Sequence, residues 1–251
     1  MIIDSHLHLP VDFHDISSKG AALINELDRN GVDRGIVIAD SELESVIGSV
    51  RECAELFKDS SIISVIAGIS PFISFFSQLE YCRELLKNGH IIGLKLYTGH
   101  EHFYCTDDCV LPVYDLAAEF DVPVLFHSGW DNSGYAAPEL LRRLAESRSN
   151  NNFVYCHCFY PELDKCFDTL KDCGNVYFDT SSVADNEKHL PDIGKTLEKT
   201  ISEMPERFIF GSDFGSCSQE VHLRFAESLR LSAKERELFM HGNAERIYKL
   251  R

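Results

Sequence analysis

The chain has 251 residues, 44% hydrophobic and 25% charged, which is the composition of a globular protein with a sizeable core. Its 24 Lys and Arg against 40 Asp and Glu give a net charge of −16, which opposes binding to nucleic acid and to anionic membranes. No apolar stretch approaches the roughly 20 residues of a membrane-spanning helix, and the first residues do not read as a secretion signal.

Short apolar runs alternate with amphipathic segments along the whole chain. The apolar runs predict eight β-strands, at Ile2–His8, Gly35–Ala39, Ile62–Gly68, Ile91–Tyr97, Val122–His127, Asn152–His157, Val176–Asp179 and Phe208–Gly211. Helical spacing predicts helices between them, at Glu42–Lys58, Phe75–Asn88, Val110–Phe120, Pro138–Ser147, Pro161–Cys173 and Asp185–Met204, and two closing helices at Ala233–His241 and Asn243–Leu250.

This rhythm predicts a single (β/α)8 TIM-like barrel, with residues 1–251 forming one domain. An open, doubly wound sheet has the same local pattern and is the structural alternative. No G-x-G-x-x-G motif follows the first strand, which weakens the dinucleotide-binding form of that alternative.

Polar side chains end several of the predicted strands, where the catalytic groups of such a barrel lie. They are His6 and His8 on the first strand, Lys95 on the fourth, His127 on the fifth, His157 on the sixth, and Asp213 after the eighth. Residues two apart on a strand point the same way, so two imidazoles at that spacing can converge on one ion. Any one of these histidines alone is more simply read as hydrogen-bonded in the core or at the surface. The set together predicts a metal site.

At this point the sequence resembles a known family. The segments "DSHLH", "GLKLYTG", "VPVLFHSG", "NNFVYCHC", "VYFDTSS", "GSDF" and "GNAERIYKL" occur in the order seen in the amidohydrolase superfamily. The chain is most similar to the amidohydrolase-related branch that also contains the ACMS-decarboxylase-like enzymes. The resemblance covers residues 2–250.

The resemblance implies a distorted barrel with a divalent metal, usually zinc, at its mouth. His6, His8, His127 and Asp213 would then be ligands of the first metal. His157 would be a ligand of a second metal or, in a one-metal site, a free acid or base that contacts the substrate. Asp4 would orient a ligand or a neighbouring strand.

Lys95 leaves the number of ions open. In two-metal members of the superfamily a strand-four lysine is carbamylated and bridges the ions, so one ion is expected, or two if Lys95 is carbamylated. The other interpretation is a Lys–Asp pair inside the barrel, with Asp213 as the partner. The family commonly has a proline shortly after "GSD", whereas this chain has Phe214 and Gly215, so no substrate is carried over by analogy.

These parts predict a metal-dependent hydrolase in which activated water attacks a small carbonyl substrate with an ester, lactone or amide-like bond. Asp213 would shuttle the proton, and His157 would stabilise the developing negative oxygen. One alternative is a decarboxylase of an unsaturated or aromatic carboxylic acid. A weaker alternative is a TatD-like deoxyribonuclease, a group that normally has glutamate where Lys95 stands. A relative that has lost catalysis is disfavoured because every expected ligand position is filled.

Loops after the strands supply the expected substrate contacts, Tyr97, His100 and Trp130, and residues 98–108 form the longest polar-aromatic loop. Each of these side chains could instead pack on the barrel rim. The nine cysteines lack the spacing of a disulfide scaffold, which indicates reduced thiols and a cytoplasmic location. A small-molecule substrate is the expected partner, and the sequence leaves open whether the chain forms a homo-oligomer.

Overall fold

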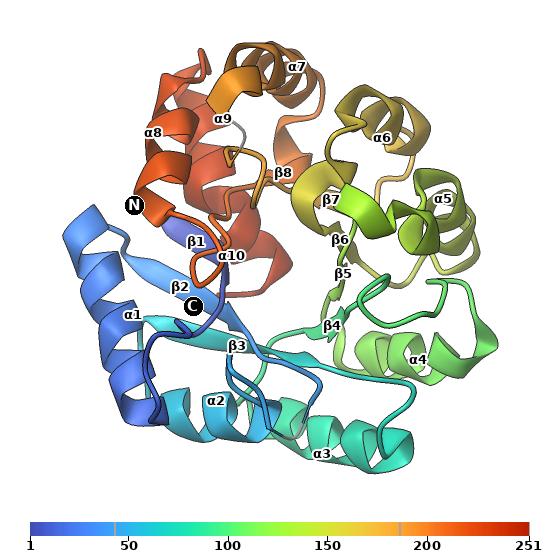
Figure 1. The fold of residues 1–251 in the computed structure, drawn as a ribbon. Coiled ribbons are helices and arrows are strands. Elements are labelled where there is room, and N and C mark those ends of the chain that lie inside the picture. The colour runs from blue at the N-terminus through green and yellow to red at the C-terminus, as the bar shows by residue number, and fades with distance from the viewer. Residues whose placement is uncertain (43, 186, 251) are drawn as a thin grey trace.

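The computed structural model describes residues 1–42, 44–185 and 187–250. Within them, eight parallel strands pair in chain order around a barrel (Figure 1). The strands are β1 (Ile3–Leu7), β2 (Arg34–Ile38), β3 (Ile63–Gly68), β4 (Leu94–Leu96), β5 (Val124–Phe126), β6 (Phe153–Tyr155), β7 (Val176–Asp179) and β8 (Phe208–Ile209).

Backbone hydrogen bonds between the segments of β1 and β8 close the ring. The Ser5 amide donates to the Phe210 carbonyl at 3.0 Å, and the Asp213 amide donates to the His6 carbonyl at 2.8 Å. The predicted (β/α)8 barrel is therefore confirmed, and an open doubly wound sheet is excluded.

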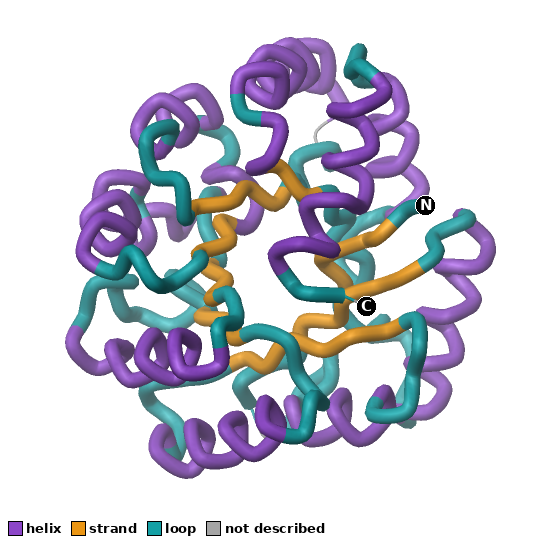
Figure 2. Tube along the Cα trace, turned by 180° about the vertical axis from the view of Figure 1, so that it is seen from behind, coloured by secondary structure: helices purple, strands orange, loops and turns teal. Residues whose placement is uncertain are grey.

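Helices surround the strands on the outside of the barrel (Figure 2). They are α1 (Ile16–Asn30), α2 (Val50–Phe57), α3 (Phe75–Lys87), α4 (Leu111–Phe120), α5 (Pro138–Ser147), α6 (Leu163–Leu170), α7 (Leu190–Glu203), α8 (Gln219–Ser228) and α9 (Ala233–Glu237). A further helix, α10 (Asn243–Ile247), packs instead against the side chains inside the barrel. None of the helices in the described part of the chain is long and apolar enough to span a membrane.

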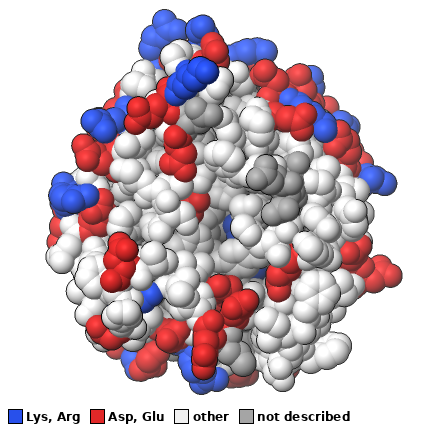
Figure 3. All heavy atoms as spheres, viewed as in Figure 1, with Lys and Arg blue, Asp and Glu red and all other residues white. Residues whose placement is uncertain are grey.

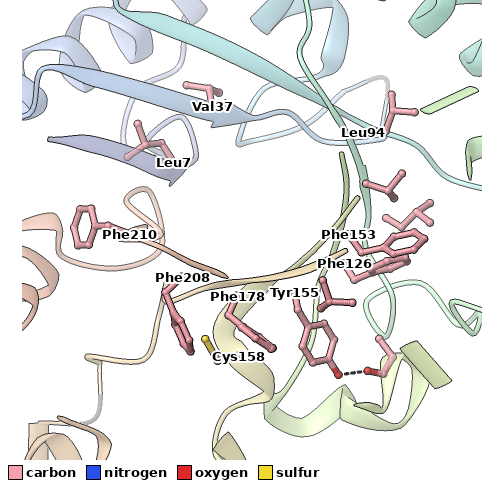
Figure 4. Close-up of a cluster of buried hydrophobic side chains, with 14 of the residues drawn as sticks. Leu7, Val37, Leu94, Phe126, Phe153, Tyr155, Cys158, Phe178, Phe208 and Phe210 are labelled. Atoms are coloured by element: carbon pink, nitrogen blue, oxygen red, sulfur yellow. Dashed lines mark hydrogen bonds between the residues drawn. The ribbon is translucent and has the colours of Figure 1, made fainter. Parts of the chain in front are cut away.

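Alternating side chains build two apolar layers. On β5 and β6, Phe126 and Phe153 point outward and pack with their tilted rings 5.7 Å apart between centroids, with Phe178 and Phe208 in the same outer layer (Figure 4). Leu125 belongs instead to the inner cluster, which also contains residues of α10. The inner positions at one end of the barrel are thus filled by apolar side chains, and the polar residues are left to the other end.

Several predicted strands are too long. The run Ile91–Tyr97 contains only the three residues of β4, and Val122–His127, Asn152–His157 and Phe208–Gly211 shorten in the same way. Flanking residues such as Ile91, Cys156 and Phe210 are apolar and buried, although they lie outside the ladder. Burial, and not strand pairing, produced the longer apolar runs.

Some helix boundaries also differ from the prediction. The helix expected at Glu42–Lys58 begins only at Val50, because Ser49 forms a capping box with Glu52. The helix expected at Asp185–Met204 begins at Leu190. Positions 43 and 186 in these predicted helices lie outside the described residues. The prediction also named no helix at α1, although Asp15 caps its start and Gly31, with φ 66°, ends it.

Candidate metal centre

Two neighbouring strand ends bring three ligating groups together. His6 lies in β1 and His8 directly follows it, and Asp213 follows β8 with φ 65°. Asp213 Oδ1 lies 3.5 Å from His6 Nε2 and 3.3 Å from His8 Nε2, and all three side chains are buried. These atoms are close enough together to hold one ion.

Glycines allow the two strand ends to approach so closely. A Cβ at Gly211 would lie 2.9 Å from the His6 Cβ and 2.5 Å from Asp179 Oδ1. At Gly215, which has φ 104°, a Cβ would lie 2.8 Å from the His8 Cβ. Side chains at either position would push β8 away from the histidines.

The partners of the two histidines fix which ring nitrogen carries the proton. His8 Nδ1 lies 2.9 Å from the Ile38 carbonyl, which can only accept a hydrogen bond. His6 Nδ1 lies 2.5 Å from the Asp179 carboxylate, and burial lowers the pKa of His6, which favours the neutral ring. In the neutral form of each ring, Nδ1 therefore donates and Nε2 presents a lone pair.

Asp213 Oδ1 faces these two lone pairs. Ser182 Oγ donates to the other oxygen, Oδ2, at 2.6 Å, whereas Oδ1 is buried and has no hydrogen-bond partner among the described residues. Three acceptors that point at one another repel unless a cation lies among them. Two imidazole nitrogens and a carboxylate oxygen suit zinc and other first-row divalent metals.

A second group of possible ligands, His6, Cys156 and Asp179, fits a metal less well. His6 and Asp179 already share a hydrogen bond. Burial raises the pKa of the Cys156 thiol to about 12, so the sulfur keeps its proton at neutral pH. Asp179 instead fixes the His6 ring from behind, as the outer partners of metal-ligating histidines do.

His127 and His157 lie beside this centre and contact each other. His157 Nδ1 lies 3.1 Å from the Ser181 carbonyl, and its Nε2 lies 3.2 Å from His127 Nδ1. Burial lowers the pKa of His157 to about 3 and that of His127 well below its usual value, so both rings are neutral. His157 thus accepts a hydrogen bond from His127 Nδ1. The lone pair on the other nitrogen of His127, Nε2, takes no part in this contact.

Lys95 is buried at the same end of the barrel. Its Nζ lies 2.9 Å from Cys156 Sγ and 5.4 Å from the centroid of the Tyr97 ring. The ion pairs of Asp213 in the described structure are with His6 and His8, so the Lys–Asp pair considered above is not formed.

Asp4 does not face the same way as His6 and His8. Its carboxylate accepts hydrogen bonds from the Ser212 amide at 2.9 Å, the Ser212 hydroxyl at 2.5 Å and the Gln219 side chain at 2.8 Å. Burial raises the pKa of Asp4 to about 7. These contacts hold the segment that leads into Asp213.

A cavity of about 340 Å³ opens above the centre. It is lined by His6, His8, Asp40, Ser41, Glu42, Ile47, Lys95, Tyr97, His100, Glu101, His127, His157, Asp213 and Ser216. Of the expected substrate contacts, Tyr97 and His100 line it. Trp130 does not, because its ring packs on Tyr160 with the centroids 4.7 Å apart.

Several groups around the metal centre and its cavity were not predicted from the sequence. Asp179 supports His6 from the end of β7, and Asp40 follows β2 by two residues. The same strand-end pattern that identified the histidines could have found both. Glu42 and Glu101 lie deeper in loops, where no spacing in the sequence distinguishes them from solvated residues.

The chain was compared with known families and structures. The amidohydrolase family model matches residues 74–250. No curated protein sequence matches the chain.

Among solved structures, an uncharacterised TIM-barrel protein from Bordetella bronchiseptica superposes with a TM-score of 0.79 at 19% identity, covering 99% of this chain and 98% of that one. The 4-oxalomesaconate hydratase of Rhodopseudomonas palustris gives 0.72 at 15% identity, over 99% and 96%. A dihydroxybenzoic acid decarboxylase from Polaromonas, with bound manganese and the inhibitor 2-nitroresorcinol, gives 0.69 at 14%, over 99% and 97%.

At these identities the structural likeness establishes the shared barrel. The family model, in contrast, covers well over half of the chain and includes His127, His157 and Asp213. The chain belongs to the amidohydrolase family of metal-dependent enzymes.

Proposed function

We propose that this enzyme is a metal-dependent hydrolase of a small carbonyl substrate with an ester, lactone or amide-like bond. The observation that supports this most is the convergence of lone pairs from His6, His8 and Asp213 below an open cavity. His127 would complete the ligand set, and one zinc ion is the preferred occupant. When bound, such a cation polarises a carbonyl and lowers the pKa of water to about 7.

The residues of the chain have distinct proposed roles around this cation. Asp213 accepts the proton of the attacking water and passes it to the leaving group, because its Oδ1 lines the cavity with no donor among the described residues. His157 holds the His127 ring in position, since both of its own nitrogens have protein partners. Lys95 supplies positive charge beside the developing oxyanion, and Tyr97 and His100 contact the substrate.

Metal content tests the centre directly. Protein purified without chelator should carry close to one equivalent of zinc or manganese by elemental analysis, and should hydrolyse members of an ester and lactone panel. Asp213→Asn should lose turnover and bind metal more weakly, because the anionic ligand is gone. Asp192→Asn, on exposed α7, removes the same charge and should change neither. Metal-free protein that gains no activity with added zinc or manganese would refute the proposal.

Decarboxylation is a second candidate, favoured by the structural similarity to the Polaromonas decarboxylase. In that reaction Asp213 would deliver a proton to the carbanion that remains after CO2 leaves. Release of CO2 from dihydroxybenzoates or unsaturated diacids, with no hydrolysis of the ester panel, would establish this candidate and overturn the first. A crystal structure with anomalous scattering would count the ions and show whether Lys95 is carbamylated.

We further propose that the substrate is a small molecule and that the enzyme is cytoplasmic. A small molecule suits the volume of the cavity, and the carboxylates of Asp40, Glu42 and Glu101 in its wall oppose a DNA backbone. All nine cysteines are free thiols, which suits the reducing cytoplasm.

A further inference from the structure

Three carboxylates line the cavity away from the metal centre. Asp40 and Glu42 follow β2, and Glu101 lies in the loop after β4. Asp40 is held by donors of its own loop, with Ser45 Oγ at 2.6 Å and the Glu42 amide at 3.3 Å. These hydrogen bonds hold the Asp40 side chain in place within its own loop.

Glu101 has an incomplete environment. Its Oε2 is buried and has no hydrogen-bond partner among the described residues. Burial raises the pKa of Glu101, and the charges of Asp40 and Glu42 raise it further, whereas a hydrogen bond with Ser70 lowers it. The three carboxylates therefore repel one another across the cavity. A positive group among them would remove this cost.

The cavity itself has little positive charge to offer. Lys95 is the only lysine or arginine in the described lining of the cavity. The Nζ of Lys95 contacts Cys156 at the floor of the cavity. Figure 3 shows a hollow on the face seen in Figure 1, with acidic side chains along its edge. The wall is therefore anionic, whereas the floor is suited to bind a cation and a carbonyl.

We infer that the substrate carries a cationic group, an ammonium or a guanidinium, on the side away from the reacting carbonyl. This rests on the proposed hydrolase activity. Glu101 contacts the cationic group, with Asp40 and Glu42 contributing charge beside it, while the carbonyl lies over His6, His8 and Asp213. Both ends share one cavity of about 340 Å³, so the substrate is compact.

Isosteric esters test the charge requirement. The 4-nitrophenyl esters of 4-(trimethylammonio)butanoate, of 5,5-dimethylhexanoate and of adipate present a positive, a neutral and a negative end on chains of similar reach. The zinc-loaded enzyme should show a kcat/KM about tenfold higher for the cationic ester than for its neutral isostere, and lowest for the anion. Added salt should shrink the difference between the cation and the anion, because the interaction is electrostatic.

Variants localise the effect. Glu101→Gln should lower the cationic-to-neutral ratio of kcat/KM by about tenfold, the factor that one lost charge contact of 1.4 kcal/mol gives. Glu44→Gln removes the same charge from an exposed position of the β2–α2 loop outside the cavity and should leave the ratio unchanged. A ratio that falls equally in both variants would reflect the overall charge of the protein and would overturn the assignment to Glu101.

The outcomes separate this inference from the function on which it rests. If no ester of any charge is hydrolysed, the hydrolase proposal fails. If the esters are hydrolysed but the anionic or neutral one is preferred, only the cationic substrate is refuted. If zinc, manganese or calcium in excess inhibits the cationic ester competitively and Glu101→Gln abolishes that inhibition, the wall binds a second metal ion and the inference is also wrong.

Discussion

Asp179 holds the His6 ring in position, and exchanging one oxygen of its carboxylate for an amide nitrogen tests this role. Its Oδ2 accepts the His6 Nδ1 hydrogen at 2.5 Å, which aims the opposite nitrogen at Asp213. Asp179→Asn leaves the size of the side chain unchanged but removes the charge that fixes the ring. We expect the affinity for zinc to fall by about 10–100-fold, as for other outer partners of metal ligands. Competition with a chromogenic chelator measures it.

Two further variants serve as controls for this experiment. Asp192→Asn changes an exposed aspartate of α7 and should leave zinc affinity as it is. Asp179→Glu keeps the charge and should recover part of the loss. Circular dichroism of each variant establishes that the barrel is folded. Unchanged affinity in folded Asp179→Asn protein would show that His6 does not depend on this carboxylate.

At the scale of single elements, α2 and α3 differ in how they begin. Ser49 caps α2 through a reciprocal pair of hydrogen bonds with Glu52, whereas Ser74, with φ 43°, caps α3 without a side-chain hydrogen bond. Ser49→Ala should therefore lower the free energy of unfolding by about 1 kcal/mol. Ser74→Ala should change it by a few tenths at most, since no cap is lost. Urea unfolding followed by fluorescence compares the two, and equal losses would contradict the assignment of the caps.

The elements also show what the sequence could predict. The order of strands and helices follows from alternating apolar and amphipathic segments, because each strand of a parallel barrel is covered on both faces. Boundaries were less accurate for a physical reason. Residues such as Ile91 and Phe210 are buried without belonging to the ladder, so hydrophobicity alone extends the strand. The capping box at Ser49 was visible in the sequence and marks the true start of α2 better than periodicity does.

At the scale of the whole molecule, the proposed metal centre spans the closure between the first and last strands. His6 lies in β1, His8 directly follows it and Asp213 follows β8, so a bound ion would join the two sides of this seam. Zinc should slow amide hydrogen exchange in residues 3–8 and 210–217 in particular. Mass spectrometry of metal-loaded and chelated protein measures this, with α4, on the opposite side of the barrel, as the internal reference. Equal protection of α4 and of the two seam segments would contradict a metal centre at the seam.

The site as a whole was predictable only where the fold dictates it. Histidines at strand ends had to meet at one end of the barrel once the barrel was predicted, and His6, His8, His127 and His157 do. The loop carboxylates were not predictable, because a glutamate such as Glu101 reaches the cavity only through the path of its own loop. The place of Trp130 depends on its own loop in the same way, since its ring packs on Tyr160 and is not part of the cavity lining.

The seam between β1 and β8 and the loops after β2 and β4 form different parts of the cavity, and protein engineers can use this difference. Gly211 and Gly215 touch the histidines of β1 so closely that the closing strand tolerates no new side chain there. The acidic residues Asp40, Glu42 and Glu101 instead lie on two loops, after β2 and β4. Mutant libraries confined to those loops should therefore yield enzymes with altered preferences and intact turnover, whereas diversity introduced at the glycines should yield mostly inactive clones.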